Sequence, residues 1–137
     1  MKYQKLKIIP LLPLLVLINF ACSNPAKDVM DAREGANNFH GYFRAQNYEA
    51  IYTNSSQRFK NVRPLADYVS MMKEIEGEYG KLVNVQEAGS ATVINSDVGK
   101  MQVLIFNLEF EKTKATERLT FSRDEHGQMR LWMFELS

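Results

Sequence analysis

Few side chains of this chain are of the types that carry out covalent or acid–base chemistry. Its 137 residues include one cysteine, Cys22, and two histidines, His40 and His126. His126 falls in a predicted hairpin turn, so we interpret it as an exposed loop residue. His40 lies about 60° from the centre of the apolar stripe of a predicted helix, at the boundary between core and solvent. A pocket could open there, and His40 and Tyr42 are the candidates for its polar wall.

No set of residues has the spacing of a metal, cofactor or catalytic site. A metal site needs several histidine, cysteine or carboxylate ligands on compatible spacings, and the two histidines stand 86 residues apart. The chain has no G-x-S-x-G, phosphate-loop or H-E-x-x-H motif. The sequence therefore predicts no metal, no bound cofactor and no catalytic residues.

The carboxylates nearest to predicted elements are interpreted as parts of solvated faces. Glu74, Glu76 and Glu78 fall in the last turns of a predicted helix. Glu109 and Glu111 fall on the side of a predicted strand that faces away from the core.

The first 21 residues have the layout of an export signal. Residues 1–7 hold three lysines and no acid, and residues 8–21 are mostly apolar. A membrane-spanning helix needs about 20 apolar residues, and this run is shorter and is interrupted by Pro10 and Pro13. A charged start, a short apolar run and a small residue at its end are typical of a signal peptide. Residues 1–21 are therefore left out of the predicted fold.

Cys22 indicates which kind of export signal this is. The stretch LINFACSN resembles the lipobox of bacterial lipoproteins, in which a small residue precedes a cysteine that is lipidated and becomes the first residue. Ala21 fits the place before the cysteine, while Asn19 and Phe20 depart from the pattern. The alternative is ordinary signal cleavage after Ser23.

The resemblance implies acyl chains such as palmitate on Cys22 and a location at the bacterial cell envelope. Where the source has an outer membrane, the protein is expected there, facing the periplasm. Residues 22–27 then form the anchor and a very short tether, and residues 28–137 form a single domain. A single cysteine also excludes an internal disulfide.

The charge of the predicted mature chain argues against a nucleic-acid partner. Removing residues 1–21 changes the count of basic against acidic residues from 17 against 16 to 14 against 16. A slightly acidic domain lacks the basic surface expected of a nucleic-acid-binding protein. The remaining 116 residues have the size of one domain.

Helical periodicity and capping signals predict three helices in the first part of the domain. Asn24-Pro25 is a good helix start, and a short helix is predicted around Tyr48–Thr53, followed by an irregular polar stretch. Pro64 opens another long helix, which Gly80 ends. The buried stripe of the first helix is predicted to hold Val29, Ala32, Ala36, Phe39 and Phe43.

A period of two after Gly80 predicts four antiparallel strands. The first is expected to bulge at Gly89, and the second carries alternating apolar residues on one face. A tight turn at Lys114-Ala115 sets Phe110 opposite Leu119, Leu108 opposite Phe121 and Glu111 opposite Arg118. A three-residue loop at Glu125–Gly127 sets Phe121 opposite Leu131 and Leu119 opposite Met133. This register gives one continuous apolar sheet face, onto which the two long helices are expected to pack.

Trp132 and Phe134 point away from that face in the predicted register. Two aromatic side chains on an outer face need cover or a partner. Either the curvature of the sheet or the chain end covers them, or they form a homodimer interface or a contact with another envelope protein.

Helices followed by a four-stranded antiparallel meander make an α+β domain, with the helices packed on one face of a curved sheet. The order of elements resembles the nuclear-transport-factor-2-like fold, also called cystatin-like, which implies a cone-shaped cavity. Residues 28–136 are also similar to a family of small exported bacterial domains of unknown function, numbered 4019 in that series. The stretches that carry this similarity are FHGYFRAQNYEAIYTNSSQRFKNV, YGKLVNVQEAGSATV and LEFEKTKATERLTFSRDEHGQMRLWMFEL.

These expectations favour a lipid-anchored envelope module that binds a small ligand or a protein without catalysis. Isomerases and hydratases of the same fold place an acid or a His–Asp pair in the cavity, whereas the inward strand positions here are predicted to be Leu, Phe and Met. An enzyme of that type, with His40 or Tyr42 as its polar group, is the first alternative. A structural partner of an envelope complex is the second.

Overall fold

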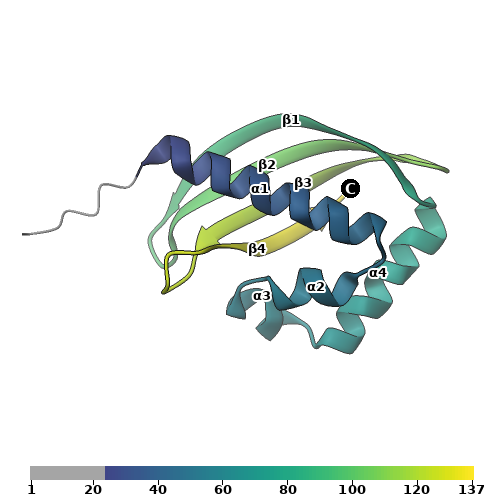
Figure 1. The fold of residues 1–137 in the computed structure, drawn as a ribbon, viewed down its shortest axis with the longest axis horizontal. Helices are drawn as coiled ribbons and strands as arrows, with labels where there is room; N and C mark the ends of the chain where they lie inside the picture. The colour runs from purple at the N-terminus through teal and green to yellow at the C-terminus, as the bar shows by residue number, and fades with distance from the viewer. Residues whose placement is uncertain (1–23) are drawn as a thin grey trace, which may run out of the picture.

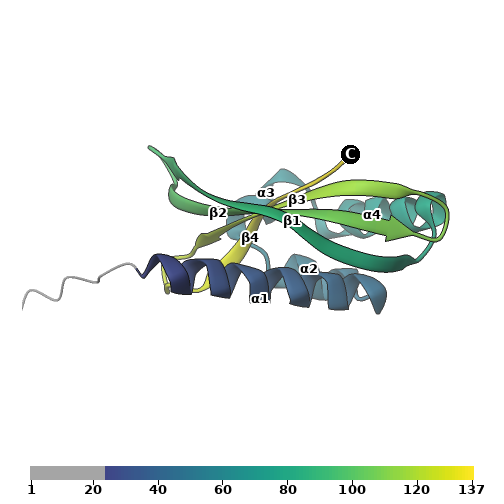
Figure 2. The same ribbon diagram turned by 90° about the horizontal axis from the view of Figure 1, so that it is seen from above.

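Residues 24–137 are described by a computed structural model, which has four helices followed by four strands. Residues 1–23, including Cys22 and the predicted signal peptide, lie outside the described residues. In chain order the elements are α1 (Pro25–Arg44), α2 (Tyr48–Thr53), α3 (Gln57–Val62), α4 (Leu65–Tyr79), β1 (Leu82–Asn95), β2 (Gly99–Phe110), β3 (Lys114–Arg123) and β4 (Met129–Leu136). The predicted α+β class is confirmed: α1 crosses one face of a curved antiparallel sheet of order β1-β2-β3-β4, and α2, α3 and α4 gather on the side of β4 (Figures 1 and 2).

α1 begins where its capping residues predict. The Asn24 side chain accepts hydrogen bonds from the backbone N–H groups of Ala26 and Lys27, and Pro25 occupies the first helical position. Of the predicted stripe, Val29 is half-buried and the other four residues are buried. The alanines and Gly35 bring α1 close to the sheet, because a Cβ built on Gly35 would lie 2.7 Å from the Phe121 ring.

The segment between α1 and α4 is more regular than its sequence predicts. α2 spans the predicted residues, but α3 replaces part of the stretch expected to be irregular. The Ser56 side chain accepts a hydrogen bond from the Phe59 N–H, and the Ser56 N–H donates to the Leu131 carbonyl of β4 at 2.8 Å. This helix of six residues is therefore stabilised by its cap and by β4. Neither feature produces an apolar periodicity in the sequence, so the periodicity did not predict the helix.

α4 starts after Pro64 and ends at Gly80, as predicted. Gly80 has φ = 83°, which favours glycine, and a Cβ there would meet the Glu111 side chain at 2.8 Å. Tyr68 and Met72 are the buried residues of α4. Near its end, Tyr79 packs edge-on against Phe110 of β2, with the ring centroids 5.4 Å apart.

The pairing of β2 with β3 differs from the predicted register. Leu119 lies opposite Leu104, not Phe110, because the hairpin closes at Phe110, whose N–H donates to the Thr113 carbonyl at 2.8 Å. The predicted Glu111–Arg118 pair is also wrong, since Arg118 lies opposite Ile105. The shift is an even number of residues, so the faces of the strands are unchanged.

The predicted bulge in β1 is confirmed, and the pairing of β3 with β4 also has a register shift. The β1–β2 register shifts between Glu87 and Gly89. Phe121 lies opposite Leu131 as predicted, but the register shifts beyond it, so Leu119 lies opposite Phe134 instead of Met133. The predicted outward position of Phe134 is therefore wrong: this residue faces the core.

Candidate functional site: the α4–β4 groove

A groove of about 340 Å³ separates α4 from β4. We call it the α4–β4 groove. Its walls are Phe59, Val62 and Arg63 at the end of α3, then Tyr68, Met71, Ile75 and Tyr79 of α4, and Trp132, Met133, Phe134 and Leu136 of β4. The volume lies within the range of about 300–1,000 Å³ typical of small-molecule sites, and a mostly apolar lining with few polar groups is also typical.

The groove exists because α4 packs more closely against α2 and α3 than against β4. The Tyr68 ring packs edge-on against Phe59, with centroids 5.3 Å apart, and lies tilted against the Tyr52 ring, with centroids 5.7 Å apart. These aromatic contacts fix the start of α4 against α2 and α3. The large side chains of α4 thereby hold the helix axis away from β4, and the space between them is not filled.

Tyr68 carries a polar group whose hydrogen-bonding capacity is unused. Its hydroxyl is buried and has no hydrogen-bond partner within residues 24–137. Burial, and then the negative charge of Glu117, raises the pKa of the Tyr68 hydroxyl, so this group stays protonated and remains a donor. An unpaired buried donor costs about 1–3 kcal/mol of stability.

Two arginines contact residues of the groove walls, Arg63 within the lining and Arg58 through Trp132. The Arg63 Nη1 lies 2.7 Å from the Met71 sulfur, and the Arg58 guanidinium stacks over the Trp132 ring at 4.5 Å from its centroid. Neither arginine forms an ion pair with a carboxylate of the described residues. Trp132 is half-buried beneath Arg58 of α3, so α3 supplies cover that was predicted to come from the sheet curvature, the chain end or a partner.

His40 is a core residue, and its predicted boundary position is wrong. Its Nε2 lies 2.5 Å from the Glu117 Oε2, and the two side chains are 4% and 2% exposed. The His40 ring packs edge-on against Phe39 and Phe106. The hollow beside the pair measures about 10 Å³, which leaves room for one water molecule at most.

The predicted apolar interior is therefore wrong at Glu117, which faces inward opposite Phe106, and at Gln102, which is buried opposite Phe121. Glu117 shares the face of Leu119 and Phe121 by simple alternation, and this signal was available in the sequence. A carboxylate at an inward position is tolerated because His40 pairs with it. Phe134 lines both this hollow and the groove, and so separates the pair from the groove.

The remaining candidates divide between the groove and other places. Trp132 and Phe134 come together in the groove, while Tyr42 lines a separate hollow of about 130 Å³ with Gly35 and Ile51. His126 is exposed in its turn, as predicted. Tyr68 and Arg63 were missed, because neither stands out from the sequence until the groove brings them together.

Glu76 also differs from its predicted role on a solvated face. It is half-buried and accepts hydrogen bonds from the Tyr48 hydroxyl and from the Gln46 side-chain amide. Burial raises the pKa of Tyr48, and the contact with Glu76 raises it further. Glu74, Glu78, Glu109 and Glu111 are exposed, in agreement with the prediction.

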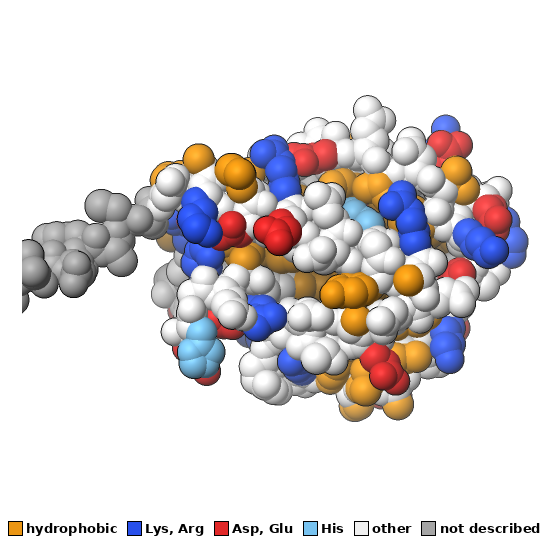
Figure 3. All heavy atoms as spheres, viewed as in Figure 1, with side chains coloured by type: hydrophobic (Ala, Val, Ile, Leu, Met, Phe, Trp, Pro, Cys, Tyr) orange, Lys and Arg blue, Asp and Glu red, His pale blue; other side chains and the backbone are white. Residues whose placement is uncertain are grey.

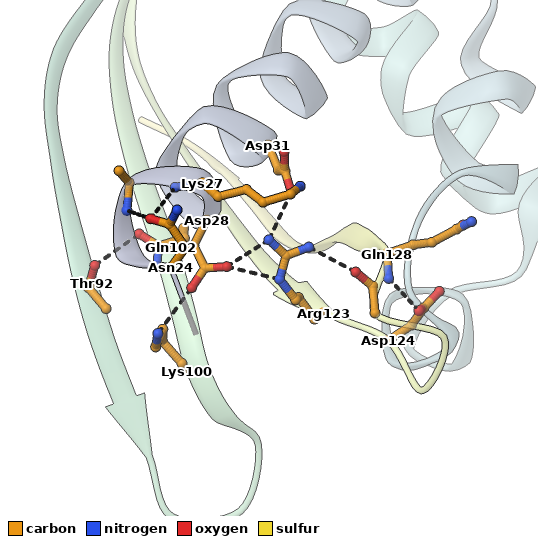
Figure 4. Close-up of polar contacts among 12 residues, drawn as sticks. Asn24, Lys27, Asp28, Asp31, Thr92, Lys100, Gln102, Arg123, Asp124 and Gln128 are labelled. Atoms are coloured by element: carbon orange, nitrogen blue, oxygen red, sulfur yellow. Dashed lines mark hydrogen bonds and ion pairs between the residues drawn. The ribbon is translucent and has the colours of Figure 1, made fainter. Parts of the chain in front are cut away.

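A charged cluster at the other end of the molecule ties α1 to the sheet (Figure 4). Asp28 accepts hydrogen bonds from Arg123 of β3 at 2.6 Å and from Lys100 of β2 at 3.0 Å. Burial raises the pKa of Asp28, but these bonds outweigh it and hold the pKa below its ordinary value. Arg123 also binds Asp31, which Lys27 contacts at 2.6 Å. The charged side chains of this cluster pair with one another, so we interpret the cluster as structural.

Over the face shown in Figure 3, acidic and basic side chains are interspersed without a patch of one sign. Within residues 24–137, no three histidine, cysteine or carboxylate side chains lie close enough to hold a metal ion. Of the described helices, none has the length and apolarity that a membrane crossing requires.

The family model described as Protein of unknown function (DUF4019) matches residues 36–133, a span that contains His40, Glu117 and nearly all of the groove residues. No curated protein matches the chain.

Proposed function

Because the chain belongs to the DUF4019 family, which is described as being of unknown function, we propose its function from its own geometry. The domain is a lipid-anchored module of the bacterial cell envelope that binds a small, largely apolar molecule in the α4–β4 groove and does not transform it. The observation that carries this proposal is the unfilled groove itself, which has the volume and the lining of a ligand site.

The lining suits an apolar ligand. Each methylene group that leaves water contributes about 0.8 kcal/mol to binding, and the aromatic rings of Tyr79, Trp132 and Phe134 offer large apolar surfaces. Met71 and Met133 are flexible and polarisable, so they adapt to the shape of a bound chain. A ligand acceptor that reached the Tyr68 hydroxyl would also satisfy its unused donor.

The envelope location rests on the sequence around Cys22. An acylated cysteine there would be separated from the Asn24 cap of α1 by Ser23 alone. Since the charged cluster around Asp28 ties the first turn of α1 to β2 and β3, the anchor would hold the whole domain close to the membrane. Mass spectrometry of the detergent-extracted protein tests this: acyl chains on Cys22 are expected, and an unmodified N-terminus at Asn24 would refute the anchor.

The His40–Glu117 pair is the observation that favours an isomerase or hydratase. It supplies a base and an acid within hydrogen-bonding distance of each other. A substrate, however, must reach these atoms, and the adjoining hollow of about 10 Å³ is too small for one. The binding module is therefore the function that the geometry supports better.

The groove is tested by titrating the described domain with N-phenyl-1-naphthylamine, a neutral fluorophore that brightens in apolar sites. We expect saturable binding that Met71→Trp, which fills the groove, weakens about tenfold. Met30→Trp is the matched control, because Met30 is 67% exposed on α1 and lies outside the groove. Val62→Trp at the groove wall is a second blocking variant, should Met71→Trp unfold the protein. Equal binding by wild type and both blocking variants would refute the groove as the site.

A further inference from the structure

We propose that the ligand of the α4–β4 groove is an amphiphile with a linear acyl chain and an anionic head, a carboxylate or a phosphate. This inference rests on the proposed function and adds the chemical class of the ligand. Three observations carry it: the length of the groove along α4, the absence of acidic side chains from its walls, and the guanidinium groups of Arg63 in its lining and of Arg58 over Trp132.

The groove follows α4. Its α4 wall runs from Tyr68 to Tyr79, and eleven residue steps of helix span about 16 Å. The β4 wall extends alongside from Trp132 to Leu136. An apolar space that extends along this length of helix can hold an extended hydrocarbon chain.

The head group is assigned from Arg63. The backbone of Arg63 is held in place, because the Tyr52 hydroxyl donates to its carbonyl oxygen at 2.8 Å. Arg63 lines the groove, and its guanidinium donates to the Met71 sulfur, a weak acceptor, at 2.7 Å. A guanidinium presents five N–H donors in a planar fork that matches a carboxylate or a phosphate. Arg63 therefore has donors available for an anionic head.

Other arginines of the domain have guanidinium groups that are paired with carboxylates. Arg33, Arg118, Arg123 and Arg130 each have a carboxylate oxygen within 3.5 Å. Arg58 has none among the described residues, so it adds positive charge over the groove residue Trp132. No Asp or Glu lines the groove, and Glu117, whose charge reaches the Tyr68 hydroxyl, is paired with His40 behind the groove wall.

The test compares ligands that share one chain and differ in the head: dodecanoate, dodecyl phosphate, dodecanol and dodecyltrimethylammonium, each below its micelle concentration. Binding is measured by calorimetry and by the fluorescence of Trp132, the only tryptophan. We expect the two anions to bind about tenfold more tightly than dodecanol and the cation to bind most weakly. Raising the salt concentration from 50 to 500 mM should weaken the anions and leave dodecanol unchanged.

Arg63→Gln should bring dodecanoate to the affinity of dodecanol and leave dodecanol itself within twofold. Arg44→Gln is the matched control, because Arg44 also lacks a carboxylate partner in the described part of the chain but lies outside the groove. Whichever anion binds more tightly identifies the head as carboxylate or phosphate. Equal affinity for dodecanol and both anions would overturn the anionic head and leave the proposed function standing. If none of the four ligands nor the naphthylamine bound, the proposed function would fail as well.

Discussion

The two long helices, α1 and α4, lie beside the same sheet but meet it differently. α1 has small residues on its buried side, with Ala32 and Ala36 fully buried and Gly35 in close approach to Phe121. α4 has large ones, including Tyr68 and Met72. Small residues let a helix backbone approach the strands until side chains fill the interface. Bulky residues that pack on neighbouring helices instead leave a gap, and that gap is the α4–β4 groove.

The groups that line the groove differ from the ion pair beneath α1, although polar groups without a partner in the described part of the chain also occur outside the groove, at the buried side-chain nitrogen of Gln102 and the buried hydroxyl of Thr120. On the α1 side, His40 and Glu117 are buried as a pair. On the α4 side, the Tyr68 hydroxyl has no partner among residues 24–137 and the guanidinium of Arg63 has no carboxylate. We infer that the α1 side serves as the rigid scaffold and the α4 side as the place where a ligand completes the structure.

The largest effect is expected from breaking the pair on the α1 side. His40→Leu leaves the Glu117 carboxylate buried and unpaired, and removing one partner of a buried pair costs about 3–5 kcal/mol. The loss should be visible as a lower midpoint of denaturant unfolding. His40→Leu combined with Glu117→Leu should recover most of the stability, because no buried charge is left. A double variant no more stable than the single one would show that the pair is not the stabilising unit.

A smaller effect is expected at the Asp28 cluster, and it depends on pH. The folded-state pKa of Asp28 lies below its ordinary value of about 3.9. Its contribution is therefore fully present above about pH 4 and is lost as the pH falls through the lowered folded-state pKa. Asp28→Asn should cost about 1–2 kcal/mol at pH 7 and make the stability less dependent on pH below 4. Parallel curves for the variant and the wild type between pH 2 and 7 would contradict this.

The close approach of α1 is tested by two glycines of the same helix. Gly35→Ala places a methyl group against the Phe121 ring, whereas a Cβ on Gly41 meets nothing within 4 Å. Alanine is favoured over glycine inside a helix by about 1 kcal/mol. Gly41→Ala should therefore raise the thermal midpoint, while the clash at Gly35 should cancel this gain or reverse it. Equal increases for both variants would mean that α1 does not lie as close to the sheet as described.

The smallest expected effect is a gain in stability, and it comes from a substitution in the groove. Tyr68→Phe removes a hydroxyl that has no partner in the described residues, so the variant should be as stable as the wild type or up to about 1 kcal/mol more stable. Tyr48→Phe is the control, because the Tyr48 hydroxyl is bonded to Glu76 and its loss should lower stability. Thermal unfolding of the two variants separates these outcomes. Strong destabilisation by Tyr68→Phe would place its hydroxyl in a hydrogen bond and remove the contrast with the α1 side.

The sequence predicted the elements of this fold better than the site. Capping residues and glycines such as Asn24 and Gly80 act locally, so the helix boundaries could be predicted from them. The residues that lie opposite Leu119 in β2 and β4 could not be predicted, because they depend on where the hairpin closes and on a register shift in the pairing with β4. The groove depends on how far α4 stands from β4, a distance that no local pattern encodes. Glu117 was predictable as inward-facing by alternation, but its pairing with His40 joins positions 77 residues apart.

The central claim is that a ligand occupies the α4–β4 groove and leaves the α1 side unchanged. The most direct measurement is a carbon-13 methyl spectrum of the methionines, recorded with and without saturating dodecanoate. Met71 and Met133 line the groove, while the exposed Met30 and the buried Met101 do not. We predict shifts for the methyl groups of Met71 and Met133 and none for those of Met30 and Met101. Unchanged Met71 and Met133 signals under saturating ligand, or shifts confined to Met30 and Met101, would contradict the claim.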